Sequence, residues 1–277
     1  MDGVMEENGC YSFDAESAFN EIRRDWTRWC DEHGFGNKKF VVGISGGKDS
    51  TVVAALATRI FGKDRVVGVL MPCNGQKDLS DSFDVVNHLE IFSYTVDIGD
   101  AFESLKAWID GIKGVKISRD ALINMPARLR MTTLYAVAQT VDGIVLNTCN
   151  LSEDVCGYST LFGDNAGSYA PLQGLTVTEI IALGDWLGLP YALVHKTPVD
   201  GLQPQSDEER LGFTYEKLDR YIRLNEGDDE FKCRVDSLFE KNKFKMKMVV
   251  IPGPKFHNFE NFVLKRSLVR EADEIQQ

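Results

Sequence analysis

Gly43-Ile-Ser-Gly-Gly-Lys-Asp-Ser50 stands between a short apolar run, Phe40–Ile44, and a stretch with helical spacing, Asp49–Phe61. The order of strand, glycine turn and helix makes this segment a loop that opens onto a helix N-terminus. Glycine lets the backbone approach an anion closely, and the first N–H groups of a helix have no intrahelical partner. We therefore predict a phosphate-binding loop formed by Gly43, Ile44, Ser45, Gly46, Gly47, Lys48, Asp49 and Ser50.

The loop departs from the two common nucleotide-binding patterns. Gly47-Lys48 is followed by Asp49 rather than by Ser or Thr, and Val42 stands where a Walker loop begins with glycine. The Gly-x-Gly-x-x-Gly spacing of dinucleotide-binding folds is also missing. Asp49 would repel phosphates unless a cation such as Mg²⁺ lies between them. The alternative is a glycine turn that Asp49 and Ser50 merely cap, with no ligand.

Strand-like and helix-like stretches alternate along the chain. Buried strands are predicted at Phe40–Ile44, Val66–Met71, Phe92–Val96 and Ile144–Asn147. Helices are predicted at Ala15–His33, Asp49–Phe61, Asp78–Leu89, Asp100–Ile109 with Asp100 as its cap, Asp120–Val141 and Thr176–Leu187. This alternation predicts a parallel sheet with helices on both faces and ligands at the carboxyl ends of its strands. A capping box, Ser206–Glu209, and a last helix, Glu260–Glu271, predict a helical C-terminal elaboration.

Composition narrows the class of protein. Hydrophobic residues make up 43% of the 277 residues, which is enough to fill a sizeable core. The formal net charge of −11 argues against nucleic acid as a partner, because phosphate backbones attract clustered Lys and Arg. No run of eighteen apolar residues and no signal peptide is found, so we expect a cytoplasmic protein. The six cysteines form no Cys-x-x-Cys pair, which argues against a zinc site.

The phosphate-binding loop resembles the pyrophosphate loop of the N-type ATP pyrophosphatases, which cleave ATP between the α and β phosphates to adenylate a substrate. Six further segments follow in the order seen in ammonia-dependent NAD synthetases of this superfamily. They are Met71–Asp78, Asn124–Met131, Asn147–Glu153, Gly157–Asp164, Pro171–Thr176 and Asp207–Gly212. The resemblance covers residues 15–256 of a single predicted domain, 1–277, whose tail is 257–277. It implies a Rossmann-like sheet of the adenine nucleotide alpha hydrolase type.

Two site residues follow the fourth predicted strand, near the carboxyl edge where the phosphate loop opens. Glu153 lies there as a candidate second Mg²⁺ ligand that faces Asp49, although an exposed loop glutamate is the alternative. Thr148 can donate a hydroxyl to the nucleotide, and in the family this position contacts ATP. Gln76 also matches a family position near ATP. The predicted catalytic set is Asp49, Glu153 and Asp164.

The substrate end is predicted mainly from the resemblance. Arg128 and Arg130 are two residues apart on a predicted helix and diverge by about 200°, so only one faces a given site. The family match favours Arg128 for deamido-NAD, with Asn124 one turn earlier on the same face. Asp164 resembles a family turn that approaches the nicotinate, although a turn-stabilising Asp is the alternative. Lys245 is the lysine of a pair that relatives share.

Several positions depart from the family pattern. Relatives often carry a phosphate-holding lysine where this chain has Val177. Ser168 and Leu161 replace Asp and Lys, Val199 replaces Ser or Thr near ATP, and Phe244 replaces a histidine beside Lys245. These changes weaken residue-level predictions on the substrate side.

The resemblance implies that deamido-NAD reacts with the α-phosphate of ATP, and that ammonia then displaces AMP. It further implies Mg²⁺ as cofactor and a homodimer that binds deamido-NAD at its interface. Because motifs begin at Gly43, we expect no separate amidase domain, and hence free ammonia rather than glutamine as the nitrogen donor. The alternatives are a tRNA-thiolating pyrophosphatase, which the charge opposes, and an ATP-binding sensor without turnover.

Overall fold

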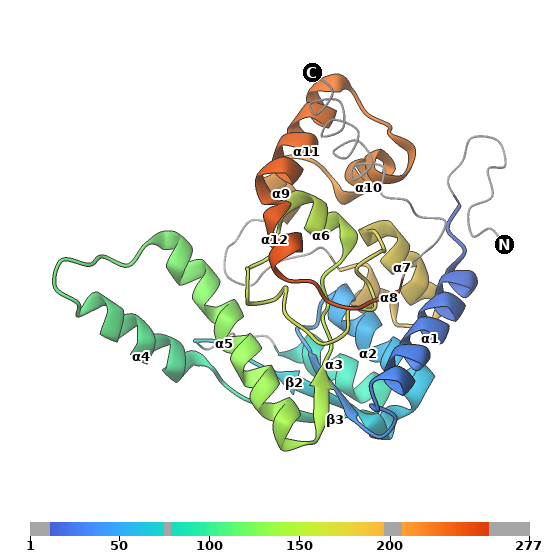
Figure 1. Ribbon diagram of the computed structural model, residues 1–277, viewed down its shortest axis with the longest axis horizontal. Coiled ribbons are helices and arrows are strands. Elements are labelled where there is room, and N and C mark those ends of the chain that lie inside the picture. Colours follow the sequence, from blue (N-terminus) through green and yellow to red (C-terminus); the bar gives the residue numbers. More distant parts are fainter. Residues whose placement is uncertain (1–11, 75–78, 197–206, 255–277) are drawn as a thin grey trace.

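The computed structural model describes residues 12–74, 79–196 and 207–254, and its centre is a four-stranded parallel sheet (Figure 1). The strands are β1 (Lys39–Gly43), β2 (Val66–Leu70), β3 (Phe92–Thr95) and β4 (Gly143–Val145). Their order is β3-β2-β1-β4, with Val41 of β1 aligned with Val67 on one side and Val145 on the other. The prediction of a parallel α/β sheet is therefore confirmed.

Side chains alternate between the two faces of the sheet, as the two-residue period of a strand requires. Phe40 and Val42 point into a core formed with α1 (Ala15–Glu32) and α2 (Lys48–Phe61), in which Trp26 is fully buried. Val41 belongs to a second core, which packs beneath α5 (Arg119–Thr140). The other elements around the sheet are the 3₁₀ turn Lys63–Arg65, α3 (Ser80–Leu89), α4 (Gly99–Asp110), α7 (Val177–Trp186) and α8 (Tyr191–Val194).

A third core lies in a helical layer above the carboxyl edge of the sheet (Figure 1). It contains the fully buried Leu218, Tyr221 and Val235. The layer consists of α6 (Leu151–Cys156), α9 (Asp207–Leu211), α10 (Tyr215–Leu224), α11 (Asp229–Asn242) and α12 (Phe244–Met248). The predicted helix Glu260–Glu271, and the predicted roles of Ser206, Gln76 and Val199, lie outside the described residues. In the ranges that are described, no helix is both long enough and apolar enough to cross a membrane.

Two element boundaries differ from the sequence prediction. Asp100 is not the cap of α4, because the helix already begins at Gly99 and Asp97 Oδ1 accepts the Gly99 N–H at 2.7 Å. The fourth strand ends at Val145 instead of Asn147. Beyond it, the Leu146 N–H still donates to Val41 O of β1, and Leu146 forms an isolated parallel bridge with Tyr169.

The two outer edges of the sheet differ in how far other segments cover them. Next to β4, Ser168 N–H donates to Val145 O, and Ala170 N–H donates to Pro252 O, so two extended segments cover that edge. At the opposite edge β3 is four residues long, and Phe92 and Tyr94 are exposed.

The antiparallel pair α4 and α5 extends beyond the sheet at the left of Figure 1. Its outer part exposes four large apolar side chains, among which Trp108 is 79% exposed. The others are Leu105, Ile112 and Val115. Only Met125, Pro126 and Ala138 of the 22 residues of α5 are buried. This helix pair is therefore poorly covered by the rest of the described chain.

Candidate active site

The predicted phosphate loop runs from the end of β1 into the first turn of α2. Gly46 has a φ of +79°, and a Cβ atom placed there would lie 2.7 Å from Asp81 Cβ. Only glycine fits this position. Gly47 has ordinary backbone angles, and a Cβ there would meet only Ser45 Oγ at 3.3 Å. Protein packing therefore explains Gly46, whereas Gly47 leaves open space beside the helix N-terminus.

Hydroxyl groups brace the loop from within. Ser45 Oγ and Ser50 Oγ lie 3.1 Å apart, and Ser45 Oγ accepts the Gly47 N–H at 3.2 Å. Ser50 Oγ donates to Gly47 O at 3.1 Å, and Thr51 Oγ1 donates to the same oxygen at 2.8 Å. The two serine hydroxyls thus shape the loop, while the amides of the first helical turn remain the groups suited to an anion.

Lys48 is buried and its ammonium does not extend freely from the loop. Nζ lies 3.0 Å from Asp49 Oδ2 and 5.7 Å from the centre of the Tyr215 ring. The side chain is 5% exposed. We therefore expect Lys48 to contribute its backbone amide to phosphate binding, while its charge partly neutralises Asp49.

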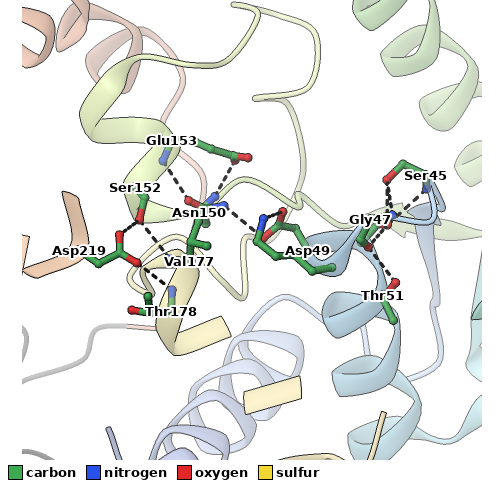
Figure 2. Close-up of polar contacts among 12 residues, drawn as sticks. Ser45, Gly47, Asp49, Thr51, Asn150, Ser152, Glu153, Val177, Thr178 and Asp219 are labelled. Carbon is green, nitrogen blue, oxygen red and sulfur yellow. Dashed lines mark hydrogen bonds and ion pairs between the residues drawn. The ribbon is translucent and has the colours of Figure 1, made fainter. Parts of the chain in front are cut away.

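Asp49 and Glu153 come from the first turns of α2 and α6, and Asn150 connects them (Figure 2). Asn150 Oδ1 accepts the Glu153 N–H at 2.9 Å, and the Asn150 N–H donates to Glu153 Oε2 at 3.2 Å. Asn150 Nδ2 donates to Asp49 Oδ1 at 3.2 Å. The first two bonds form a capping box, and the third reaches across to the other helix. Asn150 therefore contacts both predicted metal ligands, Glu153 through its backbone N–H and Asp49 through its side-chain amide.

The charge around this pair favours a cation. Burial raises the pKa of Glu153 well above its ordinary value, the negative charge of Asp49 raises it further, and Lys48 opposes both effects. Among the residues that the structure describes, no group of three His, Cys, Asp or Glu side chains is arranged to hold a metal. Two carboxylates nevertheless suit Mg²⁺, because this ion completes its shell with water and phosphate oxygens. The donor set fits the predicted ion.

The predicted substrate residues gather around residues 157–165, called here the 157–165 loop. Asn124 Oδ1 accepts from Thr160 Oγ1 at 2.7 Å, and Arg128 Nε donates to Leu161 O at 3.2 Å. On the other side, Lys245 Nζ donates to Gly157 O at 2.7 Å and to Ser159 O at 2.8 Å. Asn124, Arg128 and Lys245 thus all hold the loop, and their contact with substrate stays a prediction.

Asp164 lies inside the 157–165 loop and its side chain accepts the Thr160 N–H. Asn147 Nδ2 donates to Asp164 O at 3.0 Å, so the end of the fourth strand supports this turn. Thr148, next along the chain, is half-buried between Asn147 and the α6 cap. Asp164 therefore stabilises this turn, and its role toward substrate stays a prediction.

Arg130 points to a different place from Arg128, as their spacing predicts. Its Nε donates to Met71 O at 3.2 Å, and burial lowers its pKa. Arg128 is exposed. The two arginines therefore divide into one that supports the end of β2 and one that faces the 157–165 loop.

A cleft of about 410 Å³ adjoins this substrate end. Asp154, Asn165, Gln173, Lys245 and Val250 are among its lining residues, whereas neither the phosphate loop nor Glu153 lines it. Burial raises the pKa of Asp154 to about 7. The cleft therefore lies next to Lys245 and the 157–165 loop, and not at the phosphate loop.

The departure at Val177 has a structural explanation. Val177 is the first residue of α7, is 4% exposed, and packs in the core of the helical layer. Its N–H donates to Ser152 Oγ at 3.1 Å. A lysine could not occupy this site without removing that packing, so this chain uses the position for its core.

Two buried residues, whose contacts with other helices the sequence did not reveal, hold α6 in place. Asn150 is the first, as described above. Asp219 of α10 is the second, because its Oδ1 accepts from Ser152 Oγ at 2.5 Å and its Oδ2 accepts the Thr178 N–H at 2.8 Å (Figure 2). Nearby, Arg223 and Glu179 form a fully buried ion pair at 2.7 Å. Within the helical layer, α10 is thus bonded directly to α6, the helix that carries Glu153.

A parallel sheet with a phosphate loop after β1 and a carboxylate pair beside it defines a nucleotide-binding α/β protein. The family model for NAD synthase matches residues 24–249, and the chain belongs to that family. The predicted family and fold are both confirmed.

Named relatives agree with this assignment. An NH₃-dependent NAD⁺ synthetase of Pyrococcus horikoshii is 36% identical over 238 residues, which cover 80% of this chain and 90% of that protein. The NMN synthetase structure of Francisella tularensis has a TM-score of 0.77 and 30% identity, with 87% of this chain and 99% of that one covered. The NH₃-dependent NAD synthetase of Campylobacter jejuni has a TM-score of 0.69 and 25% identity, with coverages of 87% and 99%.

Asp219 provides a test of how the helical layer is attached. Burial raises its pKa to about 6, although bonds from Ser152 and Thr178 lower it. An unfolded Asp titrates near ~3.9, so between these values the folded protein retains a proton that the unfolded chain releases. The contribution of this residue to stability therefore falls as pH rises from 4 to 6.

Asn at position 219 cannot titrate. We expect Asp219→Asn to lower the free energy of unfolding most at pH 4 and less at pH 7, measured by urea denaturation. A cost that grows with pH would show that the carboxylate is favoured in its charged form.

Proposed function

We propose that this protein is an ammonia-dependent NAD synthetase, which amidates deamido-NAD with ATP and releases NAD, AMP and pyrophosphate. The observation that carries the proposal is the pairing of Asp49 with Glu153 beside the phosphate loop, in a chain of the NAD synthase family. The net charge of −11 is compatible with a cytoplasmic enzyme that acts on small molecules.

The residues of the loop would bind the departing pyrophosphate. Backbone amides at the start of α2 would bind this anion, and the hydrogen bonds of the Ser45 and Ser50 hydroxyls fix the shape of the loop before ATP arrives. Fixed donors of this kind stabilise developing charge without reorganisation. Mg²⁺, held by Asp49 and Glu153, would neutralise charge on the phosphates.

The substrate end would be shaped by the 157–165 loop. Arg128, Asn124 and Lys245 fix this loop from two sides, and Asp164 lies within it. Adenylation turns the nicotinate carboxylate into a reactive acyl group. The enzyme therefore has to position this acyl group for attack by ammonia, and it needs no chain of acid and base residues. Positioning of this kind can supply several kcal/mol, about 7–11 in favourable cases.

The proposal predicts NAD and AMP from ATP, Mg²⁺, ammonium and deamido-NAD. Asp49→Asn and Glu153→Gln should each lower kcat/KM by at least ~100-fold, because each removes a charge that holds the ion. Both variants should keep the fold, and the melting temperature of Glu153→Gln should stay the same or rise, because burial and the charge of Asp49 both disfavour the charged form of Glu153. Equal formation of NAD and AMP by coupled assay and chromatography would support adenylation, whereas near-normal activity of either variant would remove that residue from the metal site.

A second compound is a candidate for the substrate that is amidated. The Francisella tularensis structure is that of an NMN synthetase, so the same chemistry on nicotinate mononucleotide is a second candidate. Parallel assays with the mononucleotide and the dinucleotide, and with ammonium and glutamine as nitrogen donors, decide between these functions.

The two arginines provide a matched pair. Arg128→Ala should raise KM for deamido-NAD roughly tenfold and leave KM for ATP within about twofold, because a contact with a charged group is worth ~1.5–3 kcal/mol. Arg130→Ala should instead lower the free energy of unfolding by about 1–3 kcal/mol, since Met71 O loses its buried donor. Steady-state kinetics and urea denaturation of both variants test this, and exchanged phenotypes would reverse the assignment.

A second copy of the chain would cover the exposed part of α4 and α5. Four large apolar side chains lie there, which is unusual for a surface that faces water. Trp108→Ala should weaken the homodimer by about 2 kcal/mol or more, because buried Trp residues dominate interfaces. Sedimentation equilibrium measures this, with Tyr191→Ala, 73% exposed on α8, as the control. A monomer at all concentrations, or equal effects, would contradict the proposal.

A further inference from the structure

Asn150 occupies a position that the proposed reaction does not itself explain. It is fully buried, lies before the first turn of α6, and has the extended backbone of an N-cap, with φ −123° and ψ 169°. Its side chain makes one bond inside its own helix and one to α2. A residue needed only as a cap would make the first bond and not the second.

The chemistry of the side chain is specific to Asn. The cap needs an acceptor for the Glu153 N–H, and Ser, Thr, Asp and Asn all supply one. Asp49 Oδ1 needs a donor, and only the amide carries an acceptor and a donor on one planar group. Asp would add a third carboxylate beside Asp49 and Glu153. Ser and Thr are too short to donate a hydrogen bond to Asp49. The two demands together select Asn.

The bonds also fix the relative placement of the two carboxylates. Asp49 is attached to α2 and Glu153 to α6, and the two helices follow different strands. The Asn150 backbone N–H orients Glu153 through Oε2, and the Asn150 side-chain amide orients Asp49 through Oδ1. Glu153 is half-buried and the Asp49 side chain is 19% exposed, so each retains a path to a ligand. One buried residue thus orients both groups.

We propose that Asn150 is a positioning residue that sets the spacing of Asp49 and Glu153 and thereby the affinity of the site for a divalent cation. This inference rests on the proposed metal-binding function of the two carboxylates. Groups that orient metal ligands typically contribute 10–100-fold to metal affinity, so the effect should be measurable.

The test uses Mn²⁺ as the probe, because the fall of its free electron paramagnetic resonance signal reports binding directly. The full chain is titrated with Mn²⁺ in the presence of α,β-methylene ATP, which cannot be cleaved between those phosphates. Asn150→Ser and Asn150→Thr preserve the cap acceptor and remove the donor to Asp49. The Thr variant fills more of the buried volume, in case the Ser variant does not fold.

We expect either variant to bind Mn²⁺ about tenfold more weakly than the unchanged protein. Excess Mg²⁺ should restore kcat to within a few-fold. Thr214→Ala is the control for lost capping, because Thr214 caps α10 by accepting the Lys217 N–H at 3.2 Å. It should lower stability without changing Mn²⁺ affinity.

The outcomes separate this inference from the proposed function. If Asp49→Asn weakens Mn²⁺ binding while both Asn150 variants bind as the unchanged protein does, Asn150 is only a cap and the inference is wrong. If Asp49→Asn and Glu153→Gln leave Mn²⁺ affinity unchanged, the metal site itself is wrong. Weakened binding in the Asn150 variants that excess Mg²⁺ cannot rescue would indicate lost structure and would also overturn the inference.

Discussion

The parallel pairing of β1 with β4 is the constraint on which the site depends. Lys39 aligns with Gly143 and Val41 with Val145, so the two strands end at the same edge of the sheet. Parallel neighbours place the helices that follow them above that edge. The first turns of α2 and α6 therefore meet, and Asp49 can face Glu153 although about a hundred residues separate them. Without this pairing the phosphate loop would have no second carboxylate.

The helical layer determines how firmly α6 holds its position. This helix is only six residues long, which is too short to be stable by itself. Its support comes from Asn150 at its start, from the bond between Ser152 and Asp219, and from the apolar contacts of Leu151 and Val155 in the third core. A short helix with this support can carry a functional side chain because its neighbours, and not its own hydrogen bonds, fix its place.

The sequence predicted the sheet well, because buried strands and amphipathic helices have strong periodic patterns. β2 ends at Leu70 where Met71 was predicted, and α1 ends at Glu32 where His33 was predicted. The cap at Asp100 was wrong, because the helix already begins at Gly99, whose N–H donates to Asp97. Asn150-Leu-Ser-Glu153 has the form of a capping box, so half of the role of Asn150 was readable. Its bond to Asp49, and the burial of Asp219 in an otherwise amphipathic helix, depend on tertiary contacts that no local pattern encodes.

The unequal edges of the sheet bear on how the chain avoids misassociation. Unpaired strand edges are templates for other strands, and proteins limit them by covering or shortening them. Here the segments around Ser168 and Pro252 close the β4 side, so that side offers no free ladder of amides. The β3 side is protected mainly by its length of four residues, with Phe92 and Tyr94 exposed upon it. During synthesis or partial unfolding, edge-to-edge aggregation would therefore begin at β3 and not at the side that carries the site.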